Sequence, residues 1–153
     1  MPAETPRVTS IHIAPGARLP VKSVDHVVAE AGKGLVGDRY HGTKHRHVSV
    51  QSSTSLAEAA TAFGSPIEPA GTRRNITISH GEVSRTPGDR LRIGDVLLEV
   101  VRVAAPCKLL DDTLGRGAQE ALRRRAGSIF RVLEGGEIRV GDAVEVVQSA
   151  SVQ

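Results

Sequence analysis

The chain has 153 residues, and its 20 Lys and Arg against 17 Asp and Glu give a formal net charge of +3 at pH 7. This length predicts a single domain over residues 1–153, with a core over about 8–147, that needs no structural metal or disulfide to fold. Tryptophan is absent and aromatic residues make up only 2% of the sequence, which removes the stacking platform for exposed bases and argues against nucleic-acid binding.

Apolar spacing predicts a strand-rich chain in which glycine and proline mark the turns. The predicted strands cover residues 7–14, 24–30, 47–51, 75–79, 90–93, 96–103, 128–133, 137–140 and 143–147. A glycine-rich loop, residues 32–42, separates the second strand from the third. Turns are expected at Gly94-Asp95, Gly135-Gly136 and Gly141-Asp142.

Two helices are predicted between the strands. The first begins after Ser55, which with Glu58 resembles a capping box, and it ends at Gly64. The second covers about 118–125, where three arginines lie near its C-terminus and suit the helix dipole.

The sequence around Gly94-Asp95 is repeated around Gly141-Asp142, each time as strand, turn and strand. Two similar hairpins in one sheet favour a closed or nearly closed β-barrel, because closure removes exposed edges. Too few residues remain for helices on both faces of a parallel sheet. We therefore expect a mainly β fold, a barrel with two or three short helices.

Three polar segments could bind an anion. Lys44 and Arg46 follow the glycine-rich loop, and the histidines beside them lack the second ligand group that a zinc site needs. Ser52 and Ser53 precede the first helix, where free amides and hydroxyls can bind phosphate. Arg73 and Asn75 precede a strand and are expected to face the same way, the arginine holding phosphate and the asparagine reading a heterocycle.

Cys107, the only cysteine, follows Pro106 at the end of an apolar strand. A lone thiol cannot form an intrachain disulfide, so it is either an inert core residue or a reactive thiolate able to bind a soft metal. A solitary thiol fits a reducing compartment. No signal peptide or membrane-spanning run is apparent, so we expect a cytoplasmic protein without membrane association.

These segments together resemble the MOSC domain, the C-terminal module of molybdenum-cofactor sulfurases, in its stand-alone bacterial form. The shared motifs, in order, are Gly37-Asp38-Arg39-Tyr40-His41-Gly42, Val48-Ser49-Val50-Gln51, Arg73-Arg74-Asn75-Ile76, Gly94-Asp95, Pro106-Cys107, Arg125-Ala126-Gly127 and Gly141-Asp142. The resemblance implies a β-barrel in which Cys107 ligates molybdenum. It also implies that Lys44, Arg46, Ser52, Ser53, Arg73 and Asn75 hold the molybdopterin cofactor.

The resemblance favours an oxidoreductase that reduces N-hydroxylated substrates such as amidoximes and hydroxylaminopurines. Electrons would come from a separate ferredoxin or flavin reductase, because this chain has no iron–sulfur cysteine set. The pyridoxal-phosphate domain of the sulfurases is also absent, so that cofactor would belong to a partner.

Two other interpretations stay open. One is a carrier that delivers the cofactor, or sulfur held as a Cys107 persulfide, to a molybdenum enzyme. The other is a β-barrel interaction module with a buried cysteine.

Overall fold

The structure is a computed structural model that describes residues 4–16, 20–106 and 109–147. Cys107 lies outside these residues. The strands are β1 (Val8–Ile13), β2 (Lys22–Val24), β3 (His26–Glu30), β4 (Gly34–Leu35), β5 (Val48–Ser52), β6 (Ile76–Ile78), β7 (Arg90–Ile93), β8 (Val96–Val103), β9 (Ser128–Glu134), β10 (Gly136–Arg139) and β11 (Val144–Val147). The mainly β class predicted from the sequence is confirmed.

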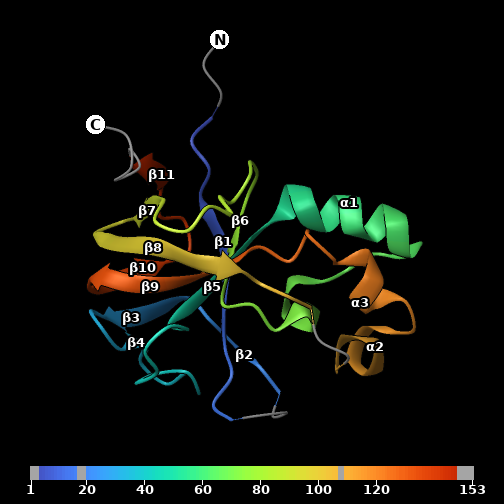
Figure 1. Cartoon of the computed structure of the whole chain (residues 1–153), viewed down its shortest axis with the longest axis horizontal. Coiled ribbons are helices and arrows are strands. Elements are labelled where there is room, and N and C mark those ends of the chain that lie inside the picture. Colours follow the sequence, from blue (N-terminus) through green and yellow to red (C-terminus); the bar gives the residue numbers. More distant parts are fainter. Residues whose placement is uncertain (1–3, 17–19, 107–108, 148–153) are drawn as a thin grey trace.

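The strands form two sheets (Figure 1). The larger has the order β11-β7-β8-β9-β5-β6-β1-β2, and the smaller has the order β10-β3-β4. The predicted barrel is not confirmed, because β11 and β2 remain the edges of the larger sheet. An isolated bridge between Arg7 and Ala143 joins the segments before β1 and β11, but it does not extend into a strand ladder.

The two Gly-Asp turns have different surroundings. Gly94-Asp95 connects β7 and β8, which pair as the predicted antiparallel hairpin. The second predicted hairpin is wrong, because β10 pairs with β3 and β11 pairs with β7 in the other sheet. The two turns nevertheless meet, since the Gly94 amide donates to the Ala143 carbonyl at 3.3 Å.

The helices lie together beside the sheets (Figure 1). They are α1 (Ser53–Phe63), the 3-10 turn η1 (Pro69–Thr72), α2 (Leu109–Leu114) and α3 (Ala118–Ala121). The predicted cap at Ser55 is wrong, because Ser52 is the N-cap and its hydroxyl accepts from the Thr54 amide at 3.2 Å. Gly64 ends α1 in the left-handed conformation, as predicted.

The second predicted helix is shorter than expected, and α2 is absent from the prediction. Helix α3 ends at Ala121, and the following chain turns through Arg124, whose φ of 64° is incompatible with a continuing helix. No helix in the described part of the chain has the length and apolar character needed to cross a membrane.

The core has two parts. The larger joins side chains of both sheets, among them Ile11, Leu35, Val50, Phe130 and Ile138. The smaller lies among the helices and contains residues such as Leu56, Leu110 and Leu122. Strands β5 and β6 form a parallel pair within the larger sheet, and their two ends carry the predicted site residues.

Candidate functional site

Asn75 lies at the N-terminal end of the β5–β6 pair and is buried. Its Oδ1 accepts from the amide and the hydroxyl of Ser49, at 2.9 and 3.1 Å. Its Nδ2 donates to the His12 carbonyl at 3.0 Å and to Asp38 Oδ1 at 3.2 Å. The side-chain amide of Asn75 therefore has protein partners for both its oxygen and its nitrogen, and it positions neighbouring segments rather than offering a hydrogen-bonding edge to a ligand.

Asp38 fixes the glycine-rich loop against this network. Its carboxylate, 6% exposed, accepts from the amides of Ala14 at 2.9 Å and Tyr40 at 3.2 Å as well as from Asn75. The loop then presents the Tyr40 ring, which both neighbouring arginines approach. The Arg39 guanidinium carbon lies 4.6 Å from the ring centroid, and that of Arg46 lies 4.2 Å from it, within cation–π range.

Arg39, Arg46 and Arg102 form a positive group that we name the basic cluster. Burial lowers the pKa of the Arg46 guanidinium from its usual value, and the charges of Arg102 and Arg39 lower it further, while Tyr40 and Asp38 oppose this shift. Within the described residues, no carboxylate forms an ion pair with any of the three. Arg39 Nε is buried and has no hydrogen-bond partner there. The cluster thus has the positive charge and the available donor that an anion-binding site needs.

The chain that leads to Cys107 is held by one contact from this end of the sheet and by one from α3. Arg74, itself buried, donates from a terminal guanidinium nitrogen to the Ala105 carbonyl at 3.1 Å. Gln119 Nε2 donates to the Pro106 carbonyl at 3.2 Å. The position of Cys107 itself lies outside the described residues, so its predicted role as metal ligand stays a prediction.

Arg73 is half-buried and has a left-handed backbone, with φ of 61°. Strand β6 begins only at Ile76, so the simple alternation expected for Arg73 and Asn75 does not apply. Lys44 is exposed beside the basic cluster on the chain entering β5. These residues and Arg46 precede the β5–β6 pair.

The histidines of this region have separate partners. His41 Nε2 lies 2.7 Å from Glu30 Oε1. His47 lies 2.7 Å from the Thr43 carbonyl through Nε2, and its Nδ1 accepts from the Val132 amide at 3.0 Å. No group of three or more metal-ligating side chains occurs among the residues that the structure describes.

Ser52 and Ser53 lie at the opposite end of β5. Ser52 pairs with Ile78, whereas Ser49 hydrogen bonds to Asn75. Ser52 lies three residue steps beyond Ser49 along the strand, about 10 Å at about 3.3 Å per step. The predicted residues therefore fall into two groups. Asp38, Arg39 and Tyr40 were part of a predicted motif but not of the predicted site, because only the folded loop brings them to Arg46. Arg102 was missed because it approaches Arg46 from β8, which is remote in sequence.

Comparisons with known proteins agree on the fold. The structure resembles that of YuaD from Bacillus subtilis, with a TM-score of 0.83 at 20% identity, covering 94% of this chain and 96% of that one. It also resembles YiiM from Geobacillus stearothermophilus, with a TM-score of 0.74 at 19% identity, covering 94% and 75%. For YiiM from Escherichia coli the TM-score is 0.71 at 18% identity, with coverage of 95% and 71%.

The sequence comparison is more specific. No curated protein matches this chain. The sequence profile of the MOSC domain matches residues 37–145, a span that includes the loop of Asp38, the β5–β6 pair and Cys107. The chain belongs to the MOSC domain family.

Proposed function

We propose that this protein binds the molybdenum cofactor beside the basic cluster and reduces N-hydroxylated substrates such as amidoximes and hydroxylaminopurines. The MOSC family is associated with the molybdenum cofactor. The observation that carries the proposal is the basic cluster itself, because its three arginines have no ion-pair partner among the described carboxylates. The cofactor carries a phosphate, and arginine binds phosphate through charge-assisted hydrogen bonds.

The residues present fit this group. Arg46 is held by Tyr40, and the buried Nε of Arg39 lacks a hydrogen-bond acceptor within the described residues. Arg46 and Arg39 would hold the anion, with Lys44 and Arg73 beside it. Asn75 would act by holding Asp38, and thereby the loop that carries Arg39. Ser52 and Ser53 lie further along β5 than this anion, and their contact with another part of the cofactor stays a prediction.

Cys107 would ligate the metal, because a thiolate is a soft ligand and the preceding Ala105 and Pro106 carbonyls are tied to Arg74 and Gln119. When bound, the cofactor supplies the redox chemistry of R–NH–OH + 2 e⁻ + 2 H⁺ → R–NH₂ + H₂O, with electrons from a separate reductase. His41, paired with Glu30, can hold and donate one of the protons.

Metal and pterin content test the proposal. The protein would be purified from cells supplied with molybdate, beside a Cys107→Ala variant. We expect near-stoichiometric molybdenum and pterin in the parent, loss of molybdenum in the variant, and reduction of benzamidoxime by the parent with a chemical electron donor. Parent protein without molybdenum or pterin would contradict the proposal, and sulfane sulfur on Cys107 would then indicate a sulfur carrier.

A further inference from the structure

An apolar cavity of about 400 Å³ lies beside β11, an edge strand of the larger sheet. We name it the β11 cavity. It is lined by residues from the segments 4–6, 78–83 and 144–146 and by Leu91 of β7. Its volume lies in the range of sites that bind small organic molecules.

The floor of the β11 cavity is part of the larger core. Ile78, Leu91 and Val144 are buried members of that core, and Val83 packs against it. Val146 lies two residues beyond Val144 on β11, so strand alternation directs both side chains to the same face. Val144 is 4% exposed, however, whereas Val146 is 81% exposed. Among the described residues, the core-facing side of β11 is therefore left uncovered at the cavity, and uncovered apolar surface of this kind marks binding sites.

Hydrogen bonds hold the wall formed by residues 4–6 in place. The Pro6 carbonyl accepts from the Val144 amide at 2.8 Å, and the Glu4 carbonyl accepts from His80 Nε2 at 2.8 Å. Because a carbonyl oxygen only accepts, Nε2 carries the proton, and Nδ1 of the same ring lies 2.9 Å from the Ser79 hydroxyl. Residues 4–6 are thus fixed to β11 on one side and to the end of β6 on the other.

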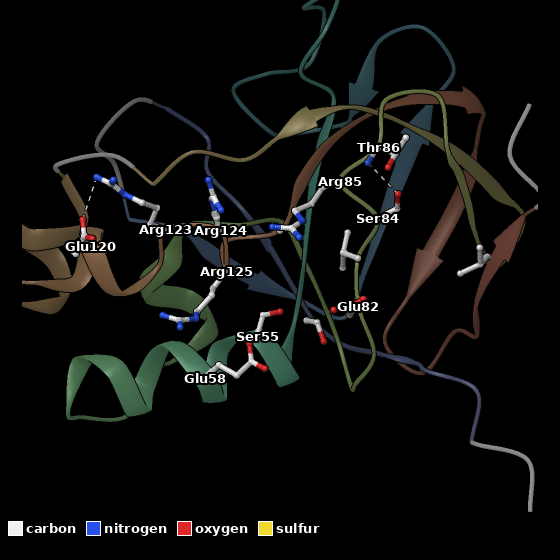
Figure 2. A pocket seen from close by; sticks show the side chains of 14 residues that line it. Ser55, Glu58, Glu82, Ser84, Arg85, Thr86, Glu120, Arg123, Arg124 and Arg125 are labelled. Carbon is white, nitrogen blue, oxygen red and sulfur yellow. Dashed lines mark hydrogen bonds and ion pairs between the residues drawn. The ribbon is translucent and has the colours of Figure 1, made fainter. Parts of the chain in front are cut away.

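The acidic residues of the β11 cavity have no basic counterpart. Glu4, Glu82 and Glu145 line it, and no lysine or arginine of the described chain does. None of the three carboxylates forms an ion pair with a described residue. The neighbouring cleft differs, because four arginines line it, among them Arg85 and Arg124 (Figure 2). In a chain of net charge +3, the β11 cavity is therefore a negative site with an apolar floor.

We propose that the β11 cavity binds a small hydrophobic cation, an organic ammonium or amidinium compound. Its apolar body would lie on Ile78, Leu91 and Val144, and its charged group would lie among the carboxylates of the rim. The buried apolar surface supplies most of the affinity, because an exposed carboxylate contributes little to an ion pair. The carboxylates select a cation over a neutral or anionic molecule. This site is separate from the basic cluster and does not rest on the proposed function.

Three probes of nearly equal size test the proposal. Benzylamine is a cation at neutral pH, benzyl alcohol is neutral, and benzoate is an anion. Two-dimensional NMR titration of the full chain reports both the affinity for each probe and the residues whose signals shift. We expect benzylamine to bind most tightly, benzyl alcohol to bind about threefold more weakly, and benzoate to bind most weakly. The methyl signals of Val83, Val144 and Val146 should shift as benzylamine is added.

Substitutions separate the charged rim from the apolar surface. A double variant, Glu4→Gln with Glu145→Gln, should bring the affinities for benzylamine and benzyl alcohol close together and leave that for benzyl alcohol unchanged. Val146→Ser should weaken the binding of both probes about twofold, because it removes apolar surface. These side chains are exposed, so the variants keep the fold. Glu68→Gln removes an exposed carboxylate outside the cavity and is the matched control.

The outcomes that would overturn the proposal concern the place and the charge. Absence of benzylamine binding at millimolar concentration, or shifts confined to residues outside the cavity, would overturn the site itself. Equal affinity of the parent for benzylamine and benzyl alcohol would overturn the selection of a cation. The same change in Glu68→Gln as in the double variant would overturn it as well, because the effect would then follow the net charge of the protein rather than the rim of the cavity.

Discussion

Asn75 and Ser49 join the starts of the parallel strands β5 and β6 through three reciprocal hydrogen bonds. The backbone amide and the hydroxyl of Ser49 donate to Asn75 Oδ1 at 2.9 and 3.1 Å, and the backbone amide of Asn75 donates to the Ser49 hydroxyl at 2.9 Å. Both residues are buried. Asn75 also donates to Asp38, which fixes the loop that carries Arg39 and Tyr40. The contact between the two strands therefore determines where the basic cluster lies.

Replacing Asn75 should therefore weaken the whole fold. Asn75→Ala leaves the Ser49 amide and Asp38 Oδ1 without this buried partner, so we expect the free energy of unfolding to fall by about 3 kcal/mol. Urea unfolding measures this change. Thr61→Ala, which removes one exposed hydroxyl bond in α1, should change stability by less than about 0.5 kcal/mol. Equal effects of the two substitutions would refute the role assigned to Asn75.

Gly127 allows β9 to start against the end of β5. A Cβ at this position would lie 1.8 Å from the Val50 carbonyl oxygen, and that oxygen belongs to the backbone and cannot move aside. We expect Gly127→Ala to cost more than about 4 kcal/mol or to prevent folding. Gly88 has a φ of 94°, close to the 83° of Gly127, but it has open space around it, so Gly88→Ala should cost only about 1–2 kcal/mol. Thermal unfolding of both variants separates the steric effect from backbone strain, and similar losses would argue against the clash.

Local patterns predicted much of the fold. The hairpin of β7 and β8 follows the alternation on either side of Gly94-Asp95, and α1 ends at Gly64 because glycine adopts the left-handed conformation without strain. Pairing between distant strands could not be predicted in this way. Strands β10 and β11 flank a turn like that at Gly94, yet they enter different sheets because their partners, β3 and β7, are remote in sequence.

The candidate site was predictable only in part. Positive charge at Arg46 and the importance of Asn75 were visible in the sequence, but the buried network of Asn75 was not, because it needs Ser49 and Asp38 in contact. The stacking of Arg46 on Tyr40 depends on a loop closed by Asp38. The turn at Arg124 also escaped prediction, since this residue appeared to lie within a helix that in fact ends at Ala121.

His47 should make the protein sensitive to mild acid. Burial is the main cause that lowers its pKa below the usual 6.5, and its Nδ1 accepts from Val132 in the neutral form. Because the unfolded chain binds the proton first as pH falls, the stability due to neutral His47 is full above about pH 6.5 and decreases below it. His47→Gln should flatten this dependence in urea unfolding between pH 7 and pH 5. Burial also lowers the pKa of His12, so part of the slope should remain. An unchanged slope would contradict the assignment to His47.

Arg46 should contribute to cofactor retention through both its charge and its planar shape. Its guanidinium lies 4.2 Å from the Tyr40 ring centroid, and a lysine would keep the charge but lose the stacked, two-pronged geometry. We expect Arg46→Ala to weaken cofactor retention by about tenfold or more, because a charge-assisted hydrogen bond is lost, and Arg46→Lys to fall between this variant and the parent. Molybdenum and pterin content after dialysis measures retention, and circular dichroism verifies folding. Arg139→Ala removes an exposed arginine that pairs with Glu137 and should retain the parent's content. Equal molybdenum and pterin content in the parent and all three variants would show that the cofactor anion does not bind at the basic cluster. A loss in Arg46→Lys as large as in Arg46→Ala would show that stacking on Tyr40, rather than charge, is the decisive contact.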